Sequence, residues 1–126
     1  MIGAMDTAYD TILEKVPPGT RLRTPDRAAG KPFIVEEIDP EGLLVRTSSG
    51  GRVKIGLFVF EAAIKYLGDL GIRGERWLPV KDEGLQMMLN SENDRVRASS
   101  YVISILQAAG LIDVIDKRPN KIRLAS

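Results

Sequence analysis

The chain has 126 residues, of which 44% are hydrophobic and 28% are charged, so it can bury a core and lacks the composition of a disordered protein. Its 18 basic and 17 acidic residues give a formal net charge of +1, which argues against a protein that coats nucleic acid through a broad basic field. The absence of cysteine and histidine excludes disulfides, Cys/His zinc sites and histidine-dependent catalytic triads.

The first half of the chain is predicted to form one helix and a small antiparallel sheet. Between residues 6 and 16 apolar side chains recur at helical spacing, and Pro17-Pro18-Gly19 ends the segment. Three or four short strands are expected, over residues 33–38, 43–47, 52–55 and, as the fourth, 20–24. Asp39-Pro40-Glu41-Gly42 has the composition of a type I turn. These features indicate a meander that forms a twisted sheet or a small barrel.

The second half is predicted to be mostly helical. Five apolar side chains share one face of a helix over about residues 57–70, which Gly71 closes. Residues 76–80 read as a short extended piece, and its proline favours an edge position. A short helix over residues 83–89 precedes a final helix over residues 99–109.

The last 28 residues carry the most informative pattern. The final helix stops at Gly110, and two apolar, β-branched runs, residues 111–116 and 121–124, follow on either side of Lys117-Arg118-Pro119-Asn120. Two such runs around a four-residue turn predict a β-hairpin with a basic tip. With a helix, a short strand and a helix before it, this order resembles the winged helix-turn-helix family over residues 57–126.

The resemblance implies an α+β protein in two parts. An N-terminal helix and a small antiparallel β meander, residues 1–56, would pack on a C-terminal winged-helix-like domain, residues 57–126. Fewer than 60 residues bury little surface alone, so we expect the meander to pack against the helical half. The resemblance also implies that the final helix and the hairpin contact DNA together.

The final helix is amphipathic at about 100° per residue. One side is apolar and is expected in the core: Tyr101, Val102, Ile105, Leu106 and Ala109. The other side carries short hydroxyls, an amide and the apolar Ile103, and we expect it to be exposed and to contact phosphates and base edges. The candidate nucleic-acid-binding residues are therefore Arg95, Arg97, Ser100, Ser104, Gln107, Lys117, Arg118, Asn120, Lys121 and Arg123.

These residues favour a duplex DNA-binding protein, either a transcriptional regulator or the DNA-binding accessory module of a larger system such as restriction or defence. The alternative is a winged-helix module for protein–protein interaction or assembly, with Ile103 as its exposed apolar marker. Both the DNA-binding function and the protein-interaction alternative are compatible with a homodimer or a larger complex. We expect no enzyme activity, cofactor, metal, membrane partner or small-molecule substrate. No apolar run approaches the ~18 to 20 residues of a membrane span, and residues 1–5 lack the form of a signal peptide, so a cytoplasmic location is expected.

The first half offers weaker candidate sites. It contains an acidic cluster, Glu36, Glu37, Asp39 and Glu41. Neighbouring strand residues point to opposite faces and the last two acids belong to a turn, which argues against a metal or acid–base site. One alternative is that the meander makes a second contact with nucleic acid through its cations, Arg21, Arg23, Arg46, Arg52 and Lys54. Elsewhere, four aromatic residues fall among apolar periodic positions and are expected in the core: Phe58, Phe60, Tyr66 and Trp77.

Overall fold

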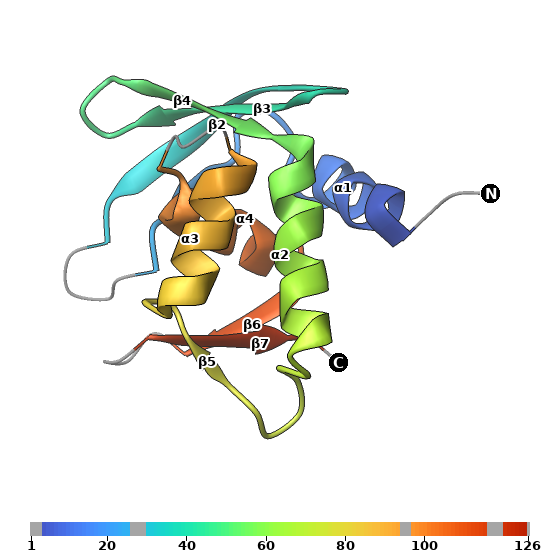
Figure 1. Cartoon of the computed structure of the whole chain (residues 1–126). Coiled ribbons are helices and arrows are strands. Elements are labelled where there is room, and N and C mark those ends of the chain that lie inside the picture. Colours follow the sequence, from blue (N-terminus) through green and yellow to red (C-terminus); the bar gives the residue numbers. More distant parts are fainter. Residues whose placement is uncertain (1–3, 26–29, 94–96, 116–119, 126) are drawn as a thin grey trace.

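The protein has an α+β architecture of two antiparallel sheets with helices between them (Figure 1). The computed structural model describes residues 4–25, 30–93, 97–115 and 120–125. Within these ranges it contains four helices and seven strands. The larger sheet lies at the top of Figure 1, the smaller sheet lies at the bottom, and α2, α3 and α4 occupy the space between them.

The N-terminal part contains the predicted helix and meander. Its elements are α1 (Ala4–Lys15), β1 (Arg21–Arg23), β2 (Pro32–Asp39), β3 (Gly42–Thr47) and β4 (Arg52–Gly56), with strand order β1-β2-β3-β4. The turn between β2 and β3 is held by the Asp39 side chain, which accepts from the backbone N–H groups of Glu41 (2.8 Å) and Gly42 (3.2 Å). Gly42 has φ +155°, and a side chain there would collide with the carbonyl oxygen of Ile55. The turn therefore requires glycine at this position.

The C-terminal part has the element order expected from the sequence. Its elements are α2 (Leu57–Asp69), β5 (Leu78–Pro79), α3 (Glu83–Glu92), α4 (Ser99–Ala108), β6 (Ile112–Ile115) and β7 (Lys121–Leu124). The second sheet has the order β5-β7-β6, so the short strand before α3 pairs with the C-terminal strand. Asp82 caps α3 by accepting from the Leu85 N–H at 2.9 Å. α3 runs three residues beyond its predicted end at 89, to Glu92.

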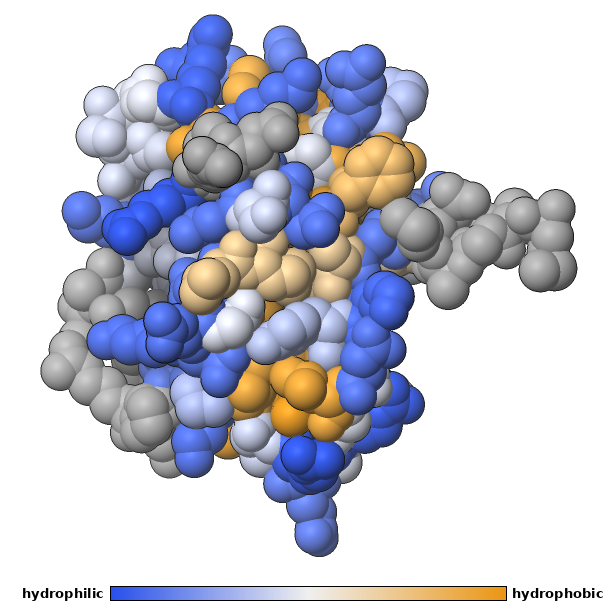
Figure 2. All heavy atoms as spheres, viewed as in Figure 1, coloured by the Kyte–Doolittle hydropathy of each residue, from blue (hydrophilic) through white to orange (hydrophobic). Residues whose placement is uncertain are grey.

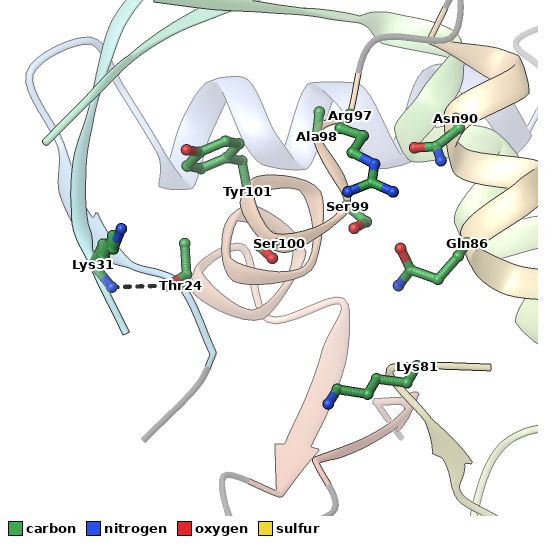
Figure 3. A pocket seen from close by; sticks show the side chains of 10 residues that line it. All are labelled: Thr24, Lys31, Lys81, Gln86, Asn90, Arg97, Ala98, Ser99, Ser100 and Tyr101. Carbon is green, nitrogen blue, oxygen red and sulfur yellow. Dashed lines mark hydrogen bonds between the residues drawn. The ribbon is translucent and has the colours of Figure 1, made fainter. Parts of the chain in front are cut away.

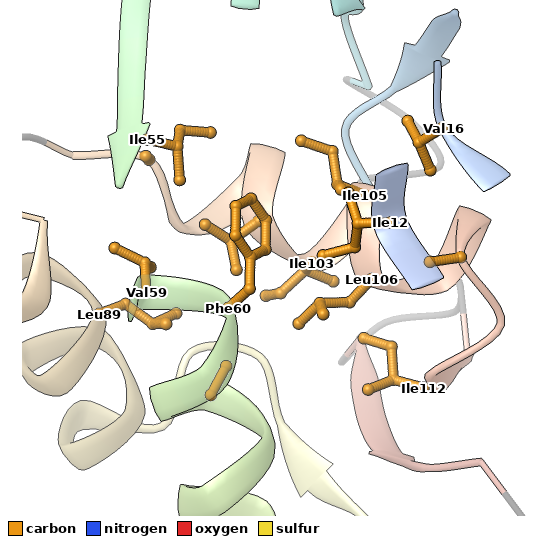
Figure 4. Packing of buried hydrophobic residues seen from close by; sticks show 14 of the residues in the cluster. Ile12, Val16, Ile55, Val59, Phe60, Leu89, Ile103, Ile105, Leu106 and Ile112 are labelled. Carbon is orange, nitrogen blue, oxygen red and sulfur yellow. The ribbon is translucent and has the colours of Figure 1, made fainter. Parts of the chain in front are cut away.

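One hydrophobic cluster joins the two parts of the chain (Figure 4). Ile12 and Val35 from the N-terminal part lie in the same cluster as Phe60, Leu67 and Leu106 from the C-terminal part. This confirms that the meander packs against the helical half. A buried hydrogen bond also joins them, because the side chain of Glu61 accepts from the backbone N–H of Tyr9 at 2.9 Å. Of the four aromatics expected in the core, Phe60 is fully buried, Tyr66 and Trp77 are half-buried, and Phe58 is 58% exposed.

Candidate nucleic-acid interface

The outer face of α4 is buried at its centre, and this corrects the expectation that the face is exposed. Ile103 and Ser104 are 1% and 4% exposed. The Ser104 hydroxyl donates to the backbone carbonyl of Arg23 at 2.6 Å, at the end of β1. The opposite, apolar side of the helix is also buried, as predicted, with Tyr101 only half-buried. Because both sides are covered, α4 cannot lay its length into a DNA groove in this arrangement.

Only the two ends of α4 reach the surface. Ser100 is exposed near its start, and Gln107 is exposed near its end. The Tyr101 ring packs edge-on against Phe33 of β2, with centroids 4.9 Å apart, so the sheet reaches as far as the first turn of the helix. Among the candidates on α4, the structure therefore leaves Ser100 and Gln107 available to a ligand and removes Ser104.

The described hairpin residues are partly engaged within the protein. Arg123 forms an ion pair with Asp113 (3.0 Å), donates to the Gly74 carbonyl and lies over the Trp77 ring at 4.2 Å. The Asn120 amide donates to the Pro25 carbonyl at 2.7 Å, which links the hairpin to the segment that follows β1. Lys121 is half-buried. Arg95, Lys117 and Arg118 lie outside the described residues.

A polar cleft lies at the start of α4 (Figure 3). Its volume is about 750 Å³, and it is lined by Thr24, Lys31, Lys81, Gln86, Asn90, Arg97, Ala98, Ser99, Ser100 and Tyr101. Three of these residues, Lys31, Lys81 and Arg97, are exposed cations, and none of the described lining residues is acidic. In a protein whose net charge is only +1, such a cluster makes a local positive site.

The helix itself adds to this positive character. α4 has no acidic residue in its first turn, and its N-cap, Ala98, provides no side-chain cap. The first N–H groups of a helix lack intrahelical partners, and the helix dipole places partial positive charge at this end. An anionic group in the cleft would therefore meet both the cations and the start of the helix.

Each wall of the cleft is fixed by local hydrogen bonds. Thr24 and Lys31 close the connection between β1 and β2, with the Lys31 N–H donating to the Thr24 hydroxyl at 2.9 Å and the Thr24 N–H donating to the Lys31 carbonyl at 3.0 Å. On the opposite wall, Gln86 of α3 donates through Nε2 to the Val80 carbonyl at 2.6 Å. In Figure 3 the Gln86 and Asn90 side chains point from α3 toward the start of α4, and Lys81 extends below Ser100.

The sequence identified Arg97 and Ser100 but missed Lys31 and Lys81. Lys31 lies in a polar loop of the meander and Lys81 follows a short strand, so neither shows a local pattern that would link it to the final helix. The fold brings them together because the N-terminal sheet and the β5–α3 connection both border α4.

Three other cations of the meander are paired with neighbouring acids. Glu36 pairs with Arg46 (2.9 Å) and Arg52 (3.1 Å), and Lys54 lies 3.8 Å from Glu41. The hydrogen bond from Arg46 and the charge of both arginines lower the pKa of the Glu36 carboxyl. These pairs make Arg46, Arg52 and Lys54 poorer candidates for a second nucleic-acid contact. They also give Glu36 a structural role, and Asp39 has one in its turn.

Comparisons with protein-family models, with curated proteins and with solved structures give no match to this chain. None of the helices in the described ranges combines the length and the apolar character that crossing a membrane requires.

Proposed function

We propose that the protein binds duplex DNA through the cleft at the start of α4. The observation that carries this proposal is that Lys31, Lys81 and Arg97 line one cleft at the uncapped end of a helix, without a carboxylate among the described lining residues. Phosphate groups are the ligands that such a combination of cations and free N–H groups favours. The contacts would be to the DNA backbone, so they would carry affinity more than sequence specificity.

The winged-helix-like arrangement of residues 57–126 is part of this proposal. It is supported by the order α2, β5, α3, α4, β6, β7 and by the pairing of β5 with β7, which fixes the hairpin beside the helices. The covered face of α4 changes the mode of binding that the resemblance implies. The end of α4, rather than its side, faces the nucleic acid, with Lys121 at the base of the hairpin as a further contact.

In this proposal the protein is a cytoplasmic, non-enzymatic DNA-binding protein, acting as a transcriptional regulator or as the accessory module of a larger system. The near-neutral net charge favours binding at one place over coating of the duplex.

Two triple variants with the same change of charge test the proposal. Replacing Lys31, Lys81 and Arg97 with alanine takes the formal charge from +1 to −2, because three positive charges are removed. Replacing Lys54, Lys65 and Arg46 with alanine makes the same change, but these cations are paired with acids outside the cleft.

The two variants should differ in binding to a random-sequence duplex, measured by fluorescence anisotropy over a salt series. The cleft variant should lose most of its affinity, and its log–log salt slope should flatten by up to about 0.9 per lost phosphate contact. The control variant should keep the wild-type slope. Equal losses in both variants would contradict the cleft as the binding site.

The second candidate function is a protein interface formed by a second copy of the chain. Phe58 of α2 and Met87 of α3 are 58% and 65% exposed, and Figure 2 shows apolar side chains over these helices. Ile103, the marker that the sequence suggested, is buried and plays no part. Sedimentation of the wild type and of Phe58→Asp tests this candidate: a wild-type dimer that the substitution dissociates would support it, and a wild-type monomer would exclude it.

A further inference from the structure

α3 presents two amide side chains to the cleft, one helical turn apart. Gln86 and Asn90 are at positions i and i+4, which lie on the same face of a helix. The Gln86 Nε2 group donates a hydrogen bond to the Val80 carbonyl. This bond fixes the amide, so that its other end, the Oε1 acceptor, points away from Val80. In Figure 3 this oxygen faces the space between α3 and the start of α4.

The second amide contains an unsatisfied acceptor. Asn90 Oδ1 is buried and has no hydrogen-bond partner. Among the described residues, it is the only buried side-chain N or O atom without one. A buried acceptor without a partner destabilises the folded state, because it has lost its hydrogen bonds to water without gaining one in the protein. Asn90 lines the cleft, so a rotation of its amide about the Cβ–Cγ bond would bring this oxygen to the cleft, where an N–H group of a ligand would satisfy it.

The cleft therefore offers two kinds of recognition side by side. Lys81, Arg97 and the start of α4 suit a phosphate, whereas Gln86 Oε1 and Asn90 Oδ1 suit a group that carries N–H donors. A duplex backbone supplies only the phosphate, since the amino groups of paired bases are held inside the helix or in its grooves. A single nucleotide outside the base stack supplies both, and the volume of about 750 Å³ lies within the range of about 300 to 1,000 Å³ typical of sites for small molecules.

We propose that the cleft accepts one unpaired nucleotide of a DNA strand, with its phosphate at Lys81 and Arg97 and an amino-bearing base, adenine, cytosine or guanine, at Gln86 and Asn90. This inference rests on the proposed DNA-binding function and deepens it. Thymine lacks an exocyclic amino group and would leave at least one of the two amide oxygens without a donor.

Three 20-base-pair duplexes labelled with fluorescein test the inference by anisotropy: one fully paired, one with a single extra adenine and one with a single extra thymine. The wild type should bind the adenine bulge about tenfold more tightly than the paired duplex, the gain expected from two added hydrogen bonds. The thymine bulge should show a clearly smaller gain.

Gln86→Ala should abolish the preference for the adenine bulge while leaving binding to the paired duplex close to wild type. Gln107→Ala makes the same substitution at the opposite end of α4. Gln107 does not line the cleft and so has no role in this proposal, and its substitution should change neither the preference nor the affinity for the paired duplex. Because Gln86→Ala also removes the bond to Val80, Asn90→Ala serves as the second variant. It removes an unsatisfied oxygen and should lower the preference without lowering the melting temperature.

Each contrary result has a distinct meaning. Binding to the paired duplex with no preference for the adenine bulge would overturn the inference and leave the proposed function standing. A preference unchanged in Gln86→Ala and Asn90→Ala would overturn it as well. Absence of binding to all three duplexes would overturn both the inference and the proposed function. Tight binding of free deoxyadenosine monophosphate without any preference for the bulge would show a free-nucleotide site and overturn the inference.

Discussion

Replacement of Ile103 by alanine tests how α4 is covered. The substitution removes three carbon atoms from a side chain that is 1% exposed. At about 0.8 kcal/mol for each buried methylene-sized group, the transfer contribution alone is about 2.4 kcal/mol. The cavity left behind adds to this value, so the expected loss is about 2 to 5 kcal/mol in the free energy of unfolding. An exposed isoleucine at this position would cost less than about 0.5 kcal/mol.

Urea unfolding followed by fluorescence of the single tryptophan, Trp77, measures this loss. The midpoint should fall with little change in the m-value, because the same surface is exposed on unfolding. Gln107→Ala, on the exposed end of the same helix, is the control and should stay within about 0.5 kcal/mol of the wild type. A loss for Ile103→Ala as small as that of the control would refute the burial of Ile103.

Three further predictions follow from the same structure. Ser104→Ala leaves the Arg23 carbonyl without its donor and should lower stability by about 1 to 3 kcal/mol in the same urea assay, without changing the salt slope of DNA binding. Burial raises the pKa of Tyr9 to about 12, so above pH 10 the unfolded tyrosine loses its proton before the folded one. Stability should therefore fall between pH 10 and pH 12, and Tyr9→Phe should reduce this fall, with a remainder from Tyr66, whose pKa is also raised by burial. Finally, the purified protein should not cleave DNA with Mg²⁺ or Mn²⁺, and cleavage that Glu36→Ala abolishes would contradict the structural role of that carboxylate.

The elements of the fold could be predicted from the sequence because each depends on local patterns. Helical spacing of apolar residues marks α1, α2 and α4, and the Asp39–Gly42 turn composition marks the β2–β3 hairpin. The strand pairing of β5 with β7 depends on contacts distant in sequence, and no local pattern shows it.

The faces of α4 could not be assigned from its periodicity alone. A helical wheel separates apolar from polar residues, but it does not show whether a second layer covers the more polar side. Ile103 was the signal: an apolar side chain on the supposedly exposed face is consistent with burial on both sides. Ser104 gave no such signal, because a serine is equally compatible with solvent and with a hydrogen bond to a backbone carbonyl.

Sequence reasoning found only part of the candidate site, because a local pattern does not show which distant segments pack against α4. Arg97 and Ser100 belong to the segment that begins α4, so a local argument found them. Lys31 and Lys81 lie 66 and 16 residues before Arg97 in the sequence, and only the packing of β1, β2 and α3 around α4 brings them into one cleft.

The most direct test of the central claim is the affinity of the wild-type protein for a random-sequence duplex, measured by fluorescence anisotropy from low to physiological salt. If Lys31, Lys81 and Arg97 each neutralise one phosphate, log K should fall linearly with log salt with a slope of about −2.7, and of about −3.6 if Lys121 neutralises a fourth. A duplex that stays unbound at low salt, or an affinity that does not change with salt, would contradict the claim that this cleft binds the DNA backbone.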